Sequence, residues 1–210
     1  AEYYNITNDY CIEVDITPNR VDGASHIGIA RDLAAYLQQT RDIHYTLPSV
    51  DAFKVDNNNA GISIEVVRPE ACPRYAGVCI EGVKVQQSPE WLQTRLKAIG
   101  HNPINNVVDV TNYVLFELGQ PLHAFDKDKI KGNKVVIRSF PNGTKFTTLD
   151  GVERELNEND LMVCNTEEPM CIAGVFGGLD SGITEQTTNV FLESACFDPV
   201  FVRKTARRHG

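Results

Sequence analysis

Five short apolar segments lie between residues 134 and 198, and they constrain the fold more than any other feature. The segments read KVVIRSF, TKFTTLDG, DLMVCN, MCIAGVFGG and TNVFLESACF, with glycine and asparagine turns between them. Short runs rich in β-branched and aromatic residues are typical of strands. No helical stretch alternates with them, which argues against a parallel βαβ sheet. The pattern predicts an α+β fold whose core is a barrel-like mixed or antiparallel sheet with flanking helices.

The N-terminal region predicts a strand, a turn and a helix. Residues 11–16 (CIEVDI) alternate polar and apolar side chains, which indicates a strand. A turn-rich stretch follows, and Ser25 is typical of a helix N-cap before an apolar helical stripe. Residues 46–60 are polar and turn-rich. We therefore expect a strand-turn-helix segment over 1–45, a linker, and one larger domain over 61–210.

Two further strands are predicted directly after the linker. Residues 62–67 (ISIEVV) and 74–85 (RYAGVCIEGVKV) have the composition of strands. Gly77 and Gly82 lie inside the second one, where an isolated glycine often marks a bulge.

Two helices come next, each between a start signal and a stop signal. Ser88–Pro89 resembles an N-cap and first-turn pair, and Asn102–Pro103 repeats that signal. Gly100 and Gly119 are the expected stops. The second helix contains a β-branched run that alone favours a strand, but its apolar spacing favours a helix. Its apolar face holds Ile104, Val107, Val108, Thr111, Val114, Leu115 and Leu118.

Composition excludes several classes of protein. The net charge of −8 at pH 7 argues against a wide surface that grips a nucleic-acid backbone, but not against a pocket for the end of a strand. Six cysteines occur without a CxxC pair or a histidine at ligand spacing, so we expect free thiols and no metal site. No apolar run reaches the roughly 20 residues of a membrane span. The missing N-terminal Met and the abrupt end suggest a section of a longer protein.

Familiar catalytic motifs are absent from the sequence. There is no GxSxG elbow, no P-loop and no obvious pair of catalytic carboxylates. The glycines of GVFGG (174–178) are not followed by the lysine and helix of a phosphate loop, so a tight turn is the simpler interpretation. Asp198–Pro199 begins a last helix with four cations, which are typical of a solvated face or an interface. No residue is marked as a covalent nucleophile.

Polar residues in apolar surroundings are the remaining candidates for a site. Thr111 and Asn112 lie in an apolar helix, and His123 follows that helix in an extended stretch. They are either a satisfied core network or the lining of a pocket. Glu193 shares one strand face with Phe191 and an alanine. A carboxylate there must find a donor or shift its pKa, unless the strand is an edge with that face in water.

Four long stretches resemble one family. In chain order they are IEVDITPNRVDGASHIGIARDLAAYL, VVDVTNYVLFELGQPLHAFD, CIAGVFGGLDSGITEQTTNVFLESACFDP and RKTARRHG. Together they resemble the β subunit of bacterial phenylalanyl-tRNA synthetase. The resemblance implies that residues 1–45 end a small helical domain called B1, and that residues 61–210 form the B3/B4 domain, with a β-barrel core.

The resemblance also implies a function, which is the hydrolysis of tyrosine wrongly esterified to tRNA(Phe). The family's acid in LESA corresponds to Glu193, and the backbone of its AG pair corresponds to Ala173 and Gly174. The remaining site residues correspond to Thr111, Asn112 and His123. All three of these would face the aminoacyl ester, which water would attack directly. The alternative is a non-catalytic structural and tRNA-docking module of the same synthetase.

The sequence departs from the family at Asn102, and the resemblance also implies partners and cofactors. Many members carry an arginine where this chain has Asn102, so the resemblance does not carry over a contact of that arginine with the tRNA end. A helix cap is the alternative role for Asn102. The partners implied are the charged acceptor end of tRNA(Phe) and an α subunit in an α2β2 enzyme, without a membrane. No cofactor is expected here, since ATP and Mg²⁺ would act elsewhere in a cytoplasmic parent enzyme.

Overall fold

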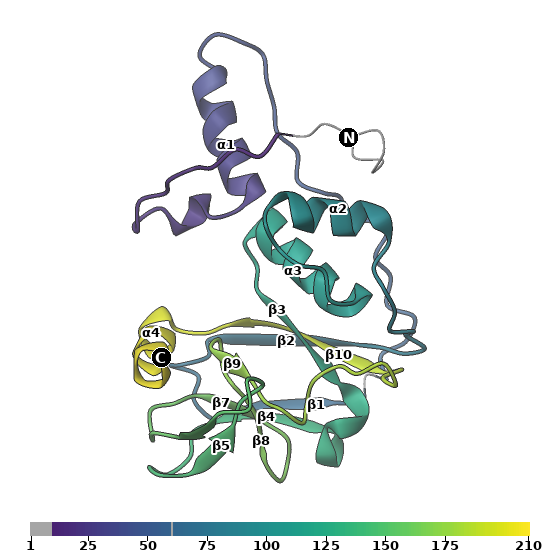
Figure 1. The fold of residues 1–210 in the computed structure, drawn as a ribbon, viewed down its shortest axis with the longest axis vertical. Helices are drawn as coiled ribbons and strands as arrows, with labels where there is room; N and C mark the ends of the chain where they lie inside the picture. Colours follow the sequence, from purple (N-terminus) through teal and green to yellow (C-terminus); the bar gives the residue numbers. More distant parts are fainter. Residues whose placement is uncertain (1–9, 60) are drawn as a thin grey trace. The chain divides into compact units, whose positions relative to one another are not determined.

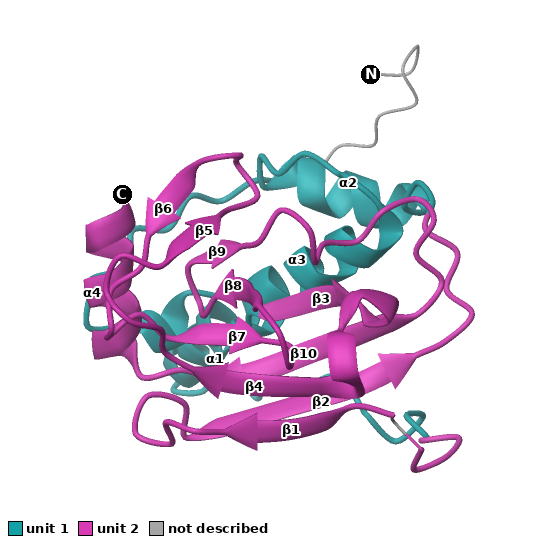
Figure 2. Cartoon of the chain, turned by 90° about the horizontal axis from the view of Figure 1, so that it is seen from below, with its two compact units in different colours: residues 1–54, 86–121 teal, residues 55–85, 122–210 magenta. Residues whose placement is uncertain are grey.

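The computed structural model describes residues 10–59 and 61–210, which form two compact units (Figures 1 and 2). Unit 1 comprises Ala1–Lys54 and Gln86–Pro121, and unit 2 comprises Val55–Val85 and Leu122–Gly210. Each unit is therefore built from two separate stretches of chain. The helices α1 to α3 belong to unit 1, whereas the sheets and α4 belong to unit 2. The domain boundaries predicted from the sequence, at residues 45 and 60, stay a prediction.

In unit 1, α1 (His26–Leu37) is preceded by the short 3-10 helix η2 (Val21–Gly23). The predicted N-cap is confirmed, since Oγ of Ser25 accepts a hydrogen bond from the amide of Gly28 at 3.0 Å. The first residue of α1 contacts the last turn of α3, where His26 Nδ1 lies 3.0 Å from the carbonyl oxygen of Phe116. The N-terminus of α1 is thus fixed against the C-terminus of α3.

The strand predicted at residues 11–16 is wrong. These residues adopt no regular structure, and most of their side chains are exposed. A strand needs a neighbour to accept and donate its backbone hydrogen bonds, and no described segment pairs with this one. The alternation of polar and apolar residues is therefore not sufficient evidence for a strand here.

The helices α2 (Glu90–Ala98) and α3 (Asn106–Leu118) occur as predicted, but both start signals were misplaced. Pro89 rather than Ser88 is the N-cap residue of α2. The hydroxyl of Ser88 instead donates to the buried carboxylate of Asp109 at 2.5 Å, and that carboxylate also accepts from the amide of Ile104 at 2.8 Å. The side chain of Asp109 thus binds the amide of Ile104, and the first helical residue of α3 is Asn106 rather than Pro103.

The cap of α3 is Asn105, so the suggestion that Asn102 is a cap is wrong. Asn105 has an extended backbone, and its side-chain oxygen accepts from the amides of Val107 and Val108 at 3.1 and 3.0 Å. Asn102 is exposed. At the other end, Gly119 adopts φ +76° and terminates the helix, as predicted.

Unit 2 contains three open sheets. The five-stranded sheet has the order β1 (Ser63–Val66), β4 (Lys134–Arg138), β7 (Met162–Cys164), β8 (Pro169–Ile172) and β9 (Phe176–Gly177). The three-stranded sheet has the order β2 (Arg74–Ile80), β10 (Val190–Cys196) and β3 (Leu122–Asp126). The hairpin of β5 (Lys145–Thr147) and β6 (Glu153–Glu155) forms the third. The pairing of β1 with β4 is parallel and the others are antiparallel.

The α+β fold with a mixed sheet is confirmed, but no barrel closes within the described residues. The five-stranded sheet ends at β1 and β9, and the three-stranded sheet ends at β2 and β3. A closed barrel needs hydrogen bonds between its first and last strands, and these edges are not paired with each other. The two sheets instead contribute side chains to one core, which includes Phe125 and Phe191 from one sheet and Val135 and Val163 from the other.

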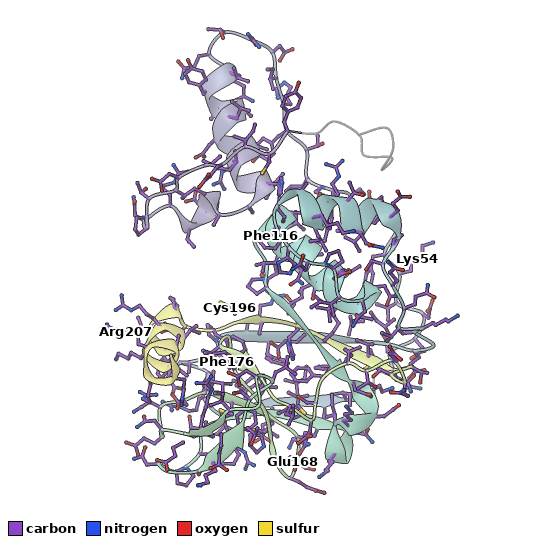
Figure 3. The ribbon with its side chains drawn as sticks, viewed as in Figure 1. Lys54, Phe116, Glu168, Phe176, Cys196 and Arg207 are labelled. Atoms are coloured by element: carbon purple, nitrogen blue, oxygen red, sulfur yellow. The ribbon has the colours of Figure 1, made fainter. Side chains whose placement is uncertain are left out.

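The helix α4 (Pro199–His209) is fixed to unit 2 at both ends. Asp198 caps its start, as the sequence predicts, by accepting from the amides of Val200 and Phe201. Near its end, Thr205, Arg208 and His209 all bind the carboxylate of Asp160, which is fully buried. One of the four cations of this helix is therefore an internal partner, while Arg207 lies exposed on the outer side (Figure 3).

Two further expectations concern the whole chain. All six cysteines are free thiols, as expected. None of the helices in residues 10–59 and 61–210 is long and apolar enough to cross a membrane.

Gly77 does not form the predicted bulge, because β2 pairs with β10 without interruption. A Cβ at this position would overlap the buried ring of Phe191. We expect Gly77→Ala to lower the free energy of unfolding by about 1–3 kcal/mol through overpacking. Urea denaturation of the chain measures this change. Gly182→Ala is the matched control, since no atom lies within 4 Å of a Cβ there, and an equal loss in both variants would contradict the packing argument.

Candidate functional site

The centre of the candidate site is β10, the middle strand of the three-stranded sheet. Glu193 lies directly opposite Gly77 of β2 on one side and His123 of β3 on the other. Residues that oppose each other in a sheet point to the same face. The same face of β10 carries Phe191, whose partner on β3 is Phe125. A carboxylate and an imidazole therefore share the face that packs against the apolar core of unit 2.

Glu193 is buried, with 6% of its surface exposed, so the alternative of an edge strand in water is wrong. The hydroxyl of Tyr75 donates a hydrogen bond to its Oε2 at 2.5 Å. Burial raises the pKa of Glu193 to about 7, although the hydrogen bond from Tyr75 opposes this rise. Burial and the nearby carboxylate raise the pKa of Tyr75 as well, so its hydroxyl stays protonated and remains a donor.

His123 is held between an aromatic ring and a glycine backbone. Its ring meets Phe125 edge-on, with centroids 4.4 Å apart and an angle of 72° between the planes. A Cβ on Gly177 of β9 would lie 3.4 Å from its Cε1. Burial lowers the pKa of His123 below its usual 6.5, so the imidazole is neutral at pH 7. The neutral imidazole beside Glu193 can donate one hydrogen bond and accept another.

The turn after β8 contains the two small residues of the predicted site. The backbone turns at residues 173–175, as expected for GVFGG, and Gly174 has φ +68°. Ala173 is buried in the main core of unit 2, and its amide already donates to the carbonyl of Leu161 at 2.9 Å. Gly174 is exposed, and a Cβ there would lie 3.1 Å from Val202 of α4. Of these two residues, Gly174 is the exposed one, and the backbone amide of Ala173 is already bonded.

Thr111 and Asn112 lie in α3 and belong to unit 1. The hydroxyl of Thr111 donates to the carbonyl of Val108 at 2.7 Å, which is the local bond expected of a buried threonine in a helix. The side-chain amide nitrogen of Asn112 lies 2.9 Å from Nε2 of His101. His101 also meets the ring of Phe116 edge-on. Both predicted residues therefore have partners inside their own unit.

The structure thus brings together four of the residues of interest within unit 2. Glu193 and His123 are register partners, Tyr75 binds Glu193, and Ala173 packs in the same core as Tyr75. Thr111 and Asn112 lie in unit 1.

A separate cavity of about 520 Å³ in unit 2 contains none of the predicted site residues. Its three lysines already have partners, since Lys131 binds Glu167 and Glu168, Lys145 binds Glu153, and Lys129 donates to the carbonyl of Gly182. In the described part of the chain, no three His, Cys, Asp or Glu side chains gather into a possible metal-binding group.

Comparison with known proteins decides the family. The model of the B3/4 domain matches residues 71–210, which is two thirds of the chain. The chain belongs to the B3/4 domain family. It is also similar over its full length to phenylalanine–tRNA ligase β subunits. The identity is 63% over 210 residues with the Bacteroides fragilis protein and 57% over 212 residues with that of Porphyromonas gingivalis. In both comparisons the chain covers 26% of the relative's length.

A solved structure supports the fold of this B3/4 chain. It is the crystal structure of an N-terminal fragment of the phenylalanyl-tRNA synthetase β subunit from Pyrococcus horikoshii. The TM-score is 0.51 at 19% identity, and the match covers 91% of this chain and 59% of the other. At this identity the likeness concerns the fold alone. The chain spans about a quarter of the length of these bacterial relatives. The activity and partners of the whole relatives therefore do not follow for this chain from similarity alone.

Sequence analysis missed two residues that contact predicted site residues, namely Tyr75 and His101. Tyr75 lies in RYAGVCI on the same strand parity as Gly77, but only the register of β2 with β10 brings it near Glu193. His101 lies in the turn between two helices, and the position of that turn depends on the buried Asp109. Strand parity was available from the sequence, whereas the register was not.

The buried Glu193 predicts a dependence of stability on pH. The folded protein holds its proton more tightly than the unfolded chain, because the pKa rises from 4.5 to about 7. The free energy of unfolding therefore falls as pH rises from about 4.5 to about 7. This contribution is on the order of 3 kcal/mol in total.

Glu193→Gln removes the titration while keeping the shape of the side chain. Relative to wild type, the variant should gain stability as pH rises through this window, measured by urea denaturation at several pH values. The exposed Glu185 supplies the control variant, Glu185→Gln. A pH-independent difference for Glu193→Gln would mean that folding does not change the pKa of Glu193, which contradicts the effect of burial.

Proposed function

We propose that this B3/4 domain hydrolyses the ester of tyrosine wrongly attached to tRNA(Phe), as part of a phenylalanyl-tRNA synthetase β subunit. The observation that carries the proposal is the buried carboxylate of Glu193, which already binds the phenol hydroxyl of a tyrosine, Tyr75, at 2.5 Å. A site that binds one phenol in an apolar core has the chemistry to bind another. The similarity to phenylalanine–tRNA ligase β subunits supplies the biological context.

The need for such a site follows from the limits of apolar recognition. A pocket built for phenylalanine cannot strongly reject an analogue that only adds a hydroxyl, and discrimination in comparable cases is about 10²-fold. A site that hydrogen-bonds the hydroxyl works in the opposite sense. When phenylalanine enters, a buried polar group loses its partner, and the resulting discrimination reaches about 10⁴–10⁵-fold. Glu193 is the group suited to this second selection.

The proposed reaction is a direct attack by water. The water oxygen bonds to the ester carbonyl carbon, and the bond from that carbon to the ribose oxygen of the terminal nucleotide breaks. One proton of the water passes to the departing ribose oxygen, so the products are free tyrosine and tRNA with its terminal hydroxyl restored. We assign Glu193 to the tyrosine hydroxyl, and Gly174 to a backbone contact, which its exposed position supports. Ala173 is assigned to the wall of the aryl pocket.

His123 is assigned to orienting the water or the ribose rather than to abstracting a proton. Its pKa is lowered by burial, so it is a weak base near pH 7. No carboxylate in residues 10–59 and 61–210 accepts a hydrogen bond from its ring, and a tuned base usually has such a partner. Thr111 and Asn112 are assigned to the ester on the resemblance alone.

The wider setting belongs to the same proposal. The partners are the charged acceptor end of tRNA(Phe) and the α subunit of the enzyme, in the cytoplasm. Aminoacylation, with ATP and Mg²⁺, is assigned to other parts of the parent enzyme.

The decisive experiment removes the carboxylate. In the intact synthetase, Glu193→Ala should lower the preference for hydrolysing tyrosyl-tRNA over phenylalanyl-tRNA by about 1.5–3 kcal/mol, the worth of a hydrogen bond to a charged group. Single-turnover deacylation of both esters measures the ratio. Glu185→Ala is the control, and unchanged aminoacylation shows that the enzyme is folded. If the full preference survives, the domain is better described as a structural and tRNA-docking module.

A second experiment tests the role of His123. We expect His123→Ala to slow deacylation by about 10–100-fold, because an orienting group contributes less than a general base, which gives about 10²–10⁴-fold. Rates are measured from about pH 5 to 8.5, a range that brackets the lowered pKa of the imidazole. The exposed His44 provides the control variant His44→Ala. A rate step below pH 6.5 that disappears only in His123→Ala would identify a general base instead.

A further inference from the structure

Tyr75 reaches Glu193 diagonally from the neighbouring strand β2. Gly77 of β2 is directly opposite Glu193, and Tyr75 lies two residues before it on the same face. Diagonal neighbours across a sheet are within reach of an aromatic side chain. The phenol of Tyr75 crosses to the carboxylate, and the ring of Phe191 occupies the space that a side chain on Gly77 would fill. The contact is therefore a product of the register of β2 with β10.

The two oxygens of the Glu193 carboxylate differ in their surroundings. Oε2 accepts the hydrogen bond from Tyr75. Oε1 accepts none from the described residues, and it is not one of the fully buried atoms that lack a partner, so it keeps some accessible surface. A carboxylate oxygen has lone pairs for further donors. One oxygen is thus fixed within the protein, and the other is free to accept a hydrogen bond from a ligand.

The titratable groups around Glu193 leave Tyr75 as its hydrogen-bond donor among the described residues. His123 faces it from β3 but is neutral, because burial lowers its pKa. From β8 and from the segment before β2, the thiols of Cys171 and Cys72 interact with the carboxylate, and burial raises the pKa of both. Neither thiol is ionised near pH 7. No Lys or Arg makes an ion pair with Glu193 in this part of the chain.

We propose that Tyr75 is a specificity-determining positioning residue, whose hydroxyl fixes the Glu193 carboxylate so that Oε1 is presented to the phenol of a bound tyrosyl ester. This inference rests on the proposed function and deepens it. A glutamate side chain has three rotatable bonds, and an unrestrained one would lose conformational freedom each time it bound a ligand. Tyr75 holds it in one orientation before the ligand arrives. Its hydrogen bond also favours the ionised carboxylate, which is the stronger acceptor for a phenol hydroxyl.

The test is Tyr75→Phe in the intact synthetase, because phenylalanine keeps the ring and removes only the hydroxyl. Hydrolysis of tyrosyl-tRNA should slow by about 10–150-fold, in line with one lost hydrogen bond to a charged group, while hydrolysis of phenylalanyl-tRNA should stay unchanged. Tyr36→Phe, at an exposed position on α1, is the matched control.

The pH profile provides a readout that a purely structural role of Tyr75 would not move. In wild type, the ratio of tyrosyl to phenylalanyl hydrolysis should rise with pH as Glu193 ionises, with a midpoint near its pKa of about 7. Loss of the Tyr75 hydroxyl removes a bond that favours the ionised form, so the midpoint should move about one to two units higher. The comparison of the two esters cancels any effect of pH on the water or on His123.

The outcomes separate this inference from the proposed function. If Glu193→Ala abolishes the tyrosine preference but Tyr75→Phe leaves both the ratio and its midpoint unchanged, the proposed function stands and the role of Tyr75 is overturned. If Tyr75→Phe strengthens tyrosine hydrolysis, Tyr75 competes with the ligand, and the positioning role is also overturned. If neither variant changes the preference, both proposals fail. Thermal unfolding of Tyr75→Phe and Tyr36→Phe shows whether a loss of rate follows a loss of folded enzyme.

Discussion

A carboxylate on the middle strand of a sheet, turned toward an apolar core, is the constraint on which the rest of the candidate site depends. An isolated charge in such a place is too costly, so the protein must supply a donor or keep the acid protonated. Glu193 combines both solutions, with a hydrogen bond from Tyr75 and a pKa raised to about 7 by burial. Gly77 and Phe191 are explained together, since the absence of a side chain on Gly77 leaves room for the buried ring of Phe191 beside Glu193. The cost of burial is acceptable where the polar group has a ligand to recognise.

The sequence predicted elements better than it predicted their partners. Strands β4, β5, β7, β8 and β10, and helices α1 to α4, all lie where apolar spacing and turn residues indicated. Errors arose where the outcome depended on a distant residue. Ser88 was expected to cap α2, but the buried Asp109 offers its hydroxyl a charged acceptor. The hairpin strand β6 (Glu153–Glu155) was not predicted, because its three charged residues show no alternation of polar and apolar side chains.

The candidate site was predicted as a set of residues, and the structure adds their geometry. Strand parity indicated that Glu193 would face apolar neighbours, and the sheet makes His123 its register partner. The sequence could not identify Tyr75, because a shift of one residue between β2 and β10 would turn every side chain of β2 to the other face. It also could not distinguish Ala173, whose amide is already bonded, from Gly174, whose position is exposed. The position of Tyr75 and the contrast between Ala173 and Gly174 depend on hydrogen bonds with neighbouring segments of the chain.

The docking of α1 on α3 has a consequence for the order in which the chain acquires its structure during synthesis. The start of α1 contacts Phe116 near the end of α3, yet the two segments of unit 1 are separated by the first segment of unit 2. A ribosome adding about 5–20 residues per second needs roughly 3–13 s to extend the chain from Lys54 to Pro121. During that interval α1 lacks the surface on which it packs, and β2 lacks β10 for longer still. Unit 1 is therefore completed first, and unit 2 waits for its central strand, which is among the last elements to emerge.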